Sequence, residues 1–227
     1  MKFTVPVRCS SCECDFAALG YGELTFPPAT CPSCGQPIHI LDPLSYSIVA
    51  IRLLYRAGAE LNSGDSTMSI ICAAMAIESA LTSLFLKWRK MAHGSPITDA
   101  DQELWEKEYR DGTRPGGFAN SANFVSNYLH GKNFDDFAAA WLEQNKNNPV
   151  AIVRASLPRY ESEIKIDYIH RELFKKRNRI MHWGEVSYEN KDAELAHKAA
   201  CSAFALLTLM DQEKAAELER KIRTPSV

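Results

Sequence analysis

The chain has 227 residues, which is enough for one ordinary domain and a small addition to it. Hydrophobic residues make up 46% of the chain and charged residues 24%, as in a globular protein with a sizeable core. The net charge of −2 excludes a molecule that attracts nucleic acids with its whole surface, so RNA or DNA would have to bind to a local basic patch.

The beginning of the chain predicts no secretory signal, because the string MKFTVPVRCSSCEC has no apolar stretch before its first cysteine. The most apolar stretch of the sequence, 66–86, contains Glu78 and several serine and threonine residues. It therefore predicts a buried helix rather than a membrane span. We expect a cytoplasmic protein without membrane contact, whose cysteines are reduced or bound to metal.

A zinc ribbon is predicted over 1–42 from two cysteine pairs. The pairs Cys9-x2-Cys12 and Cys31-x2-Cys34 are separated by the 18 residues from 13 to 30, a spacing typical of sites in which two tight turns hold one tetrahedral ion. In the string CPSCGQ, the proline stiffens the second turn and the glycine allows the backbone to fold under the metal. The alternatives are a disulfide framework and unrelated free thiols. Cys14 is a surplus cysteine that would replace Cys12 only in a looser site.

The predicted metal is structural Zn²⁺. A closed set of four thiolates from Cys9, Cys12, Cys31 and Cys34 leaves no coordination position open for a substrate. A segment of about 40 residues rarely folds on apolar burial alone, so the metal would supply much of the folding free energy. Basic residues are few here, which leaves open what the ribbon binds.

The rest of the chain, 43–227, predicts a mainly α fold, a helical bundle with an insertion at about 94–160. The glycine-rich segment 111–117 is expected to be a loop or lid, and it lacks the Gly-Lys-Ser/Thr ending of a phosphate-binding loop. The segment 23–26 of the ribbon resembles a short strand. The expected helices are 46–61, 66–92, 99–109 with a cap near Thr98, 118–129, 134–145, 162–183 and 191–222.

Two charged residues interrupt apolar helical stripes. Glu78 is the only charged residue between Asp65 and Lys87, and Arg177 interrupts a stripe that includes Leu173 and Ile180. A buried carboxylate is costly unless a cation or several donors meet it, so we expect Glu78 and Arg177 to meet across a helix interface. Two alternatives remain: Arg177 extends to water, or the two residues form a purely structural pair.

A histidine follows Arg177 near the end of the same predicted helix. The string is RNRIMHWG, from Arg177 to Gly184, and Gly184 suits a C-terminal cap. Five steps along a regular helix turn the side chain by about 140°, so Arg177 and His182 do not share a narrow face. They converge if the last turn loosens or if a second subunit supplies one of them. The simplest interpretation of His182 alone is a capping or packing histidine.

This string resembles the Arg-x4-His signature of the HEPN superfamily, in which a polar residue, often asparagine, follows the arginine. Asn178 matches that polar position, and the late helix, the apolar helix with an embedded glutamate and the all-helical remainder match as well. Many HEPN proteins are metal-independent endoribonucleases that act as homodimers. The resemblance implies a helical bundle over about 44–222, with the segment 94–160 departing from the minimal pattern.

The resemblance implies a role for each residue of the motif. His182 would move protons while a ribose 2′-hydroxyl attacks the adjacent phosphate, Arg177 would stabilise the phosphorane, and Asn178 would orient the scissile group. Glu78 would hold Arg177 in place. Beside these catalytic residues, the cations expected to bind the RNA substrate are Lys175, Lys176 and Arg179.

The function expected from the resemblance is cleavage of single-stranded RNA, by a prokaryotic toxin or phage-defence effector that an antitoxin or other protein partner would control. The alternative is a catalytically inactive HEPN-like binding or adaptor module, in which the zinc ribbon docks a partner. A zinc-ribbon protein that binds DNA is disfavoured by the acidic net charge.

Overall fold

The structure is a computed structural model, which describes residues 2–8, 15–21, 29–31, 33–38, 45–93, 97–148, 157, 161–184 and 187–223. The chain divides into two compact units, Met1–Ile48 and Val49–Val227. Most of the described residues are helical, which confirms the mainly α fold class.

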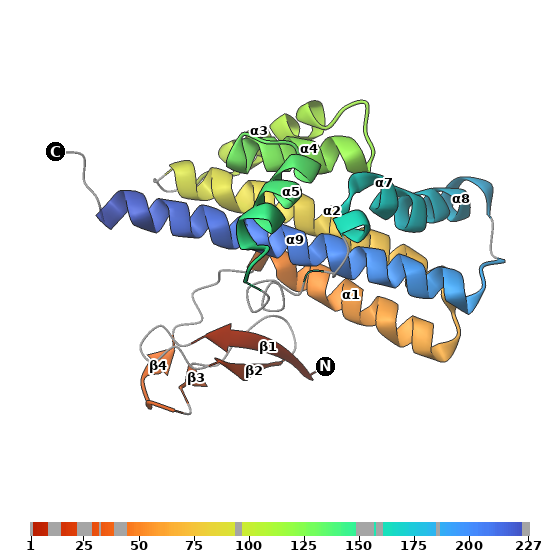
Figure 1. Cartoon of the computed structure of the whole chain (residues 1–227), viewed down its shortest axis with the longest axis horizontal. Helices are drawn as coiled ribbons and strands as arrows, with labels where there is room; N and C mark the ends of the chain where they lie inside the picture. Colours follow the sequence, from red (N-terminus) through yellow and green to blue (C-terminus); the bar gives the residue numbers. More distant parts are fainter. Residues whose placement is uncertain are drawn as a thin grey trace. The chain divides into compact units, whose positions relative to one another are not determined.

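The described residues of the N-terminal unit form two short antiparallel strand pairs. Strand β1 (Lys2–Arg8) pairs with β2 (Asp15–Tyr21), so that Lys2 lies opposite Tyr21 and Arg8 opposite Asp15. Strand β3 (Ala29–Thr30) pairs with β4 (Pro37–Ile38) (Figure 1). In the sequence these two strands flank the second cysteine pair. The predicted strand at 23–26 lies outside the described residues.

The helical unit contains most of the predicted helices, with ends that differ from the prediction by at most three residues. Thr98 caps α3 through a reciprocal capping box with Asp101, as the sequence predicts. The elements are α1 (Ser45–Ser63), α2 (Ser66–His93), α3 (Asp99–Gly112), α4 (Phe118–His130), α5 (Phe134–Asn145), η1 (Glu161–Ile164), α7 (Ile166–Ile169), η2 (His170–Phe174), α8 (Lys175–Trp183) and α9 (Asn190–Arg223).

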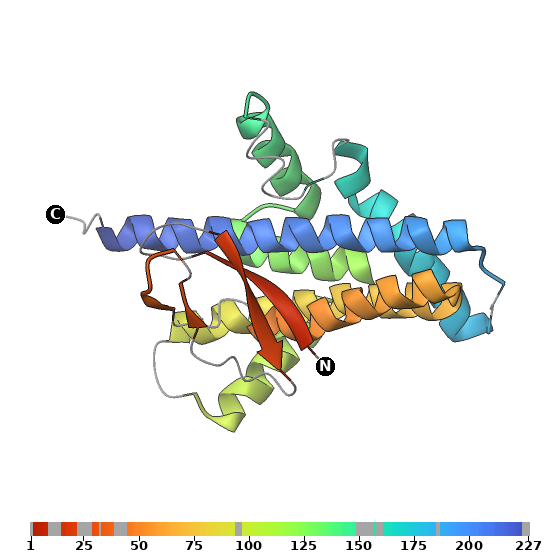
Figure 2. The same ribbon diagram turned by 90° about the horizontal axis from the view of Figure 1, so that it is seen from below.

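The core lies around α2 and α9, which run side by side along much of their length (Figures 1 and 2). Both helices contain fully buried alanines, whose small side chains favour the close approach of helices. Helix α2 is long and apolar enough to cross a membrane, but 61% of its most apolar window is buried inside the protein. It is therefore the central helix of this bundle. The fully buried alanines are Ala73, Ala74, Ala76, Ala80, Ala199, Ala200 and Ala203.

The segment predicted to be an insertion, 94–160, contributes to this core. Phe85 of α2 packs against the rings of Tyr109 from α3 and Phe124 from α4. Phe118, at the start of α4, stacks on Phe174 of η2 with ring centroids 4.6 Å apart. Helices α3 and α4 therefore hold both the central helix and the segment that leads into α8.

The predicted single helix 162–183 is wrong. The chain forms a 3₁₀ turn, a short α-helix and a π-helical turn (η2) before α8 begins. The break occurs at Lys165, whose backbone is extended, because Asp135 of α5 accepts a hydrogen bond from the Ile166 backbone N–H at 2.9 Å and so caps a new helix. π turns break the regular α-helical hydrogen-bond ladder and often occur at functional sites. Here η2 leads directly into α8, which is therefore a candidate for a functional helix.

Candidate functional site

The predicted contact between the two interrupting charges is present. The guanidinium of Arg177 on α8 donates a hydrogen bond from Nη2 to Oε1 of Glu78 on α2. Its Nη1 donates to Oδ1 of Asn178 at 2.9 Å. The two amino ends of one planar guanidinium thus have different acceptors, which fixes the orientation of its plane.

The expectation that the Glu78 carboxylate is buried is wrong. The Glu78 side chain is 45% exposed and that of Arg177 is 23% exposed. Met75, one turn earlier on α2, is also exposed, so the apolar stripe of this helix continues onto the surface. Periodicity identifies an apolar face but does not reveal what covers it. The pair therefore lies at the rim of the helix interface, where water lowers the desolvation cost and a bound anion would have access.

A polar cluster from the middle segment lies beside Glu78. Thr82 donates from Oγ1 to the backbone carbonyl of Glu78 at 3.1 Å. The phenol of Tyr109 on α3 hydrogen-bonds with Thr82 and with Ser121 of α4. Burial raises the pKa of Tyr109, and the negative charge of Glu78 raises it further, so this phenol stays neutral. Sequence reasoning missed Tyr109, because nothing in its short charged helix distinguishes it from a surface residue.

His182 lies on an exposed turn at the end of α8. Among the described residues its side chain makes no hydrogen bond or ion pair, so the imidazole is available to a ligand. Gly184 ends the helix in the left-handed conformation, with φ of 64°, and its N–H donates to the carbonyls of Arg179 and Ile180; this confirms the predicted cap. Because α8 is regular, Arg177 and His182 project about 140° apart, and one chain does not bring them together.

The three flanking cations differ in environment. Lys175 and Arg179 are exposed on α8. Lys176, in contrast, has a side chain that is only 14% exposed, and its ammonium lies 3.3 Å from Oε2 of Glu172 and 3.0 Å from Oδ1 of Asp192. The prediction that Lys176 binds substrate is therefore corrected: its charge is used inside the protein.

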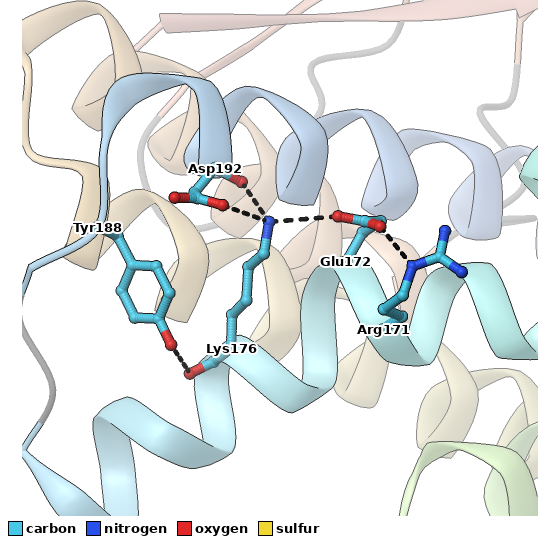
Figure 3. Close-up of polar contacts among 5 residues, drawn as sticks. All are labelled: Arg171, Glu172, Lys176, Tyr188 and Asp192. Atoms are coloured by element: carbon cyan, nitrogen blue, oxygen red, sulfur yellow. Dashed lines mark hydrogen bonds and ion pairs between the residues drawn. The ribbon is translucent and has the colours of Figure 1, made fainter.

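Figure 3 shows the cluster around Lys176. Its ammonium lies between the carboxylates of Glu172 on η2 and Asp192 on α9, and Arg171 donates from Nε to Oε1 of Glu172 at 2.7 Å. The phenol of Tyr188 donates to the backbone carbonyl of Lys176 at 3.4 Å (Figure 3). The cluster thus ties the π turn, the start of α8 and the start of α9 together, and so fixes the helix that carries Arg177.

Removing the Lys176 charge is expected to destabilise the fold. Replacement by methionine leaves the Glu172 and Asp192 carboxylates without their shared cation, which should lower the free energy of unfolding by about 1–3 kcal/mol. Urea unfolding followed by circular dichroism measures the loss. The neighbouring exposed Lys175→Met is the matched control and should change stability by less than about 0.5 kcal/mol. An equal effect of the two variants would contradict the structural role of Lys176.

The same cluster predicts a dependence on pH. Burial raises the pKa of Glu172, but hydrogen bonds from Arg171 and Lys176 outweigh burial and hold the net pKa below the ordinary value of 4.5. A carboxylate whose pKa is lowered by folding stabilises the protein above its unfolded pKa, and that stabilisation is lost as the pH falls through the folded pKa. The stability difference between wild type and Glu172→Gln should therefore shrink as the pH falls below 4.5. A difference that is constant with pH would contradict this origin.

Two of the four predicted zinc ligands lie in a described turn. The N–H of Gly35 donates to the Cys31 carbonyl and the N–H of Cys31 donates to the Gln36 carbonyl, each at 2.9 Å. Gly35 has φ of 69°, a conformation that favours glycine. Cys31 and Cys34 thus share one tight turn between β3 and β4, which fits the predicted metal site. Cys9 and Cys12 lie outside the described residues, within which no group of three or more potential ligands is found.

No family model matches this chain, and neither a curated protein nor a solved structure matches it. The chemistry of the candidate site therefore has to be argued from its own geometry.

Proposed function

We propose that the protein is a metal-independent endoribonuclease of the HEPN type, which cleaves single-stranded RNA. The observation that carries the proposal is the arrangement around α8. Glu78 of α2 and Asn178 of α8 hold the Arg177 guanidinium at a partly exposed rim, and α8 exposes His182. Histidine exchanges protons near neutral pH, and a planar guanidinium suits the oxygens of a phosphate.

The proposed reaction needs no external nucleophile. His182 accepts the proton of a ribose 2′-hydroxyl, and the 2′ oxygen attacks the neighbouring phosphorus. Arg177 stabilises the negative charge of the phosphorane, and Asn178 orients the scissile group. The bond from phosphorus to the 5′ oxygen then breaks, and that leaving oxygen takes a proton from water. The products carry a 2′,3′-cyclic phosphate and a 5′-hydroxyl.

A homodimeric site is part of the proposal, for a geometric reason. Within one chain the regular helix α8 directs Arg177 and His182 about 140° apart, and the Arg177 guanidinium is held by Glu78. A second copy related by two-fold symmetry would bring its own His182 to the Arg177 of the first. Lys175 and Arg179, the exposed basic residues of α8, would give such a cleft the positive potential that the acidic chain lacks.

The N-terminal unit is proposed to be a zinc ribbon in which Cys9, Cys12, Cys31 and Cys34 bind one structural Zn²⁺. The turn between Cys31 and Gly35 supports this assignment. In the cytoplasm of a prokaryote the enzyme would serve as a toxin or phage-defence effector, with the ribbon available to recruit an antitoxin or another partner.

The zinc assignment predicts a metal content that depends on the cysteines. Purified protein should contain about one Zn²⁺ per chain, and Cys31→Ser should lose most of it, because three remaining thiolates leave the tetrahedral set incomplete. Elemental analysis after gel filtration measures the ratio. Cys201→Ser, which alters a cysteine of α9, is the control and should retain the metal. Full zinc content in Cys31→Ser would contradict the ligand set.

The alternative is a catalytically inactive HEPN-like module that binds a partner. One observation favours it: Arg177 already has two acceptors in the fold, so a purely structural ion pair would look the same within one chain. In such a module His182 would remain remote from any groove shared between two copies.

The deciding experiment is incubation of the purified protein with single-stranded RNA in the presence of a chelator. We expect cleavage that continues without divalent metal, with fragments that carry a 5′-hydroxyl and a cyclic phosphate, identified by mass spectrometry. The rate per chain should rise with protein concentration where the dimer dissociates. Absence of cleavage, or cleavage that requires a divalent metal, would contradict the proposed enzyme.

A further inference from the structure

One tryptophan of this chain is exposed beside the candidate site. Trp183, the last residue of α8, is 84% exposed. The other three tryptophans, Trp88, Trp105 and Trp141, are 6%, 3% and 8% exposed, so the fold buries every one of them except this one. Because a large aromatic side chain that stays in water forfeits the free energy of its burial, this exposure requires a physical explanation.

The position of Trp183 is set by a rigid end of the helix. Gly184 turns the chain into the left-handed conformation directly after it, and the two hydrogen bonds of its N–H close the last turn. No further helical turn follows to cover the indole. The ring therefore projects from an ordered backbone, which suits a platform for stacking because little conformational entropy is lost when a ligand binds.

The residues that accompany Trp183 define the chemistry of the surface. On a regular helix Lys175, Arg179, His182 and Trp183 fall within about 100° of one another, and all four are exposed. We call these four residues the α8 outer face. Arg177 and the buried Ile180 project from the opposite side, toward the rest of the bundle. The α8 outer face thus combines two positively charged side chains, the imidazole of His182 and the indole of Trp183.

Exposed cations that share a helix face with one exposed indole suit a single-stranded nucleic acid. The cations contact phosphates, while the aromatic ring stacks on a base that no complementary strand holds. A duplex fits poorly, since its bases are already stacked and paired. A second copy of the chain also fits poorly without an anion between, because the exposed cations Lys175 and Arg179 would face the same two cations of the other copy.

We propose that the α8 outer face binds single-stranded RNA and that the indole of Trp183 stacks on a nucleobase next to the scissile phosphate. This inference rests on the proposed function and deepens it by naming how the substrate is held. Trp183 is a positioning residue: it holds the base, while Lys175 and Arg179, about two turns and one turn earlier on α8, hold the backbone on one side of that base. Stacking tolerates every base, so the surface selects strandedness rather than sequence.

The test uses the full-length protein and a short single-stranded RNA in which every 2′-hydroxyl is methylated, so that it binds but lacks the nucleophile. Quenching of the exposed tryptophan and fluorescence anisotropy of a labelled strand report binding. We expect Trp183→Leu to raise Kd about tenfold and Trp183→Phe, which keeps a stacking ring, to raise it no more than about threefold. Met181→Ala, which removes another exposed side chain of α8, should leave Kd unchanged.

Several results would overturn the inference. Equal Kd values for wild type and Trp183→Leu would exclude stacking, and equal binding of duplex and single strand would exclude the role of an unpaired base. Tryptophan emission that shifts to the blue with protein concentration alone would assign Trp183 to a contact between copies. Cleavage is measured separately with unmodified RNA. Binding that depends on Trp183, without cleavage, would contradict the proposed enzyme but not the stacking of Trp183 on a base. Cleavage by a protein whose RNA binding does not depend on Trp183 would contradict only the stacking.

Discussion

Replacing His182 with alanine is expected to lower kcat for single-stranded RNA by about 10²–10⁴-fold, because no other group at the site exchanges protons near neutral pH. Binding of RNA should change little by comparison, since Lys175, Arg179 and Trp183 remain on the exposed side of α8. A gel assay with end-labelled RNA gives the rate, and anisotropy gives the affinity. His182 is exposed and caps nothing in the described structure, so the variant should unfold at the wild-type temperature.

His170→Ala is the matched control for this variant. His170 is also an exposed histidine, but it begins the π turn η2 rather than ending α8. We expect its cleavage rate to stay within about twofold of wild type, since a surface residue outside the site contributes little to the transition state. Cleavage by His182→Ala at the wild-type rate would remove the proposed general base.

Replacing Arg177 with alanine is expected to lower kcat by about 10²–10³-fold, the loss typical of removing one donor to a developing oxyanion. Arg177→Lys should not rescue the rate, because a single ammonium does not reproduce the fork that holds Glu78 with Nη2 and Asn178 with Nη1. Arg179→Ala, on the exposed side of the same helix, is the control: it should raise KM and weaken the dependence on salt while kcat is largely retained.

The variant Glu78→Gln tests whether Glu78 orients the Arg177 guanidinium for catalysis or only stabilises the fold. The amide keeps a hydrogen-bond acceptor for Arg177 but loses the charge that orients the guanidinium. A purely structural pair predicts a lower melting temperature with unchanged kcat, whereas a positioning role predicts a lower kcat at temperatures where both proteins are folded. Because the Glu78 side chain is 45% exposed, we expect the change in stability to be small.

Mixing two inactive variants tests the composite site directly. If one copy supplies Arg177 and its partner supplies His182, a dimer of Arg177→Ala with His182→Ala contains one complete site. Random exchange of subunits should then restore about a quarter of the wild-type rate, since half of the dimers are mixed and half of their sites are complete. Neither variant alone should recover on the same treatment. Absence of any recovery after demonstrated subunit exchange would exclude a site divided in this way.

Local patterns in the sequence are sufficient to predict most of the helices. Capping signals are local interactions, so Thr98 and Gly184 identify helix ends without any knowledge of the fold. The failure at 162–183 has a different origin: the break at Lys165 is stabilised by Asp135, a residue of another helix. No periodicity within 162–183 contains that information.

The candidate site also has features that the sequence predicts and features that depend on distant parts of the chain. From the sequence alone, the interrupted apolar stripes predict that Glu78 and Arg177 meet, and the contact is present. The reason that the stripes suggest, burial of both charges, does not hold, because the Glu78 side chain is 45% exposed. The constellation of Arg177, Asn178 and His182 is also visible in the sequence, as is the cysteine spacing. Their proposed functions follow from resemblance and chemistry, and the experiments above address them.

Only the tertiary structure decides how these side chains are used. Lys175 and Lys176 are neighbours of the same type, yet Lys175 is exposed while Lys176 lies between Glu172 and Asp192. Likewise three tryptophans are buried and Trp183 is not. Helix geometry fixes the direction in which a side chain projects, but its burial depends on the element that packs there. That element comes from distant parts of the chain, so it cannot be read from the local pattern.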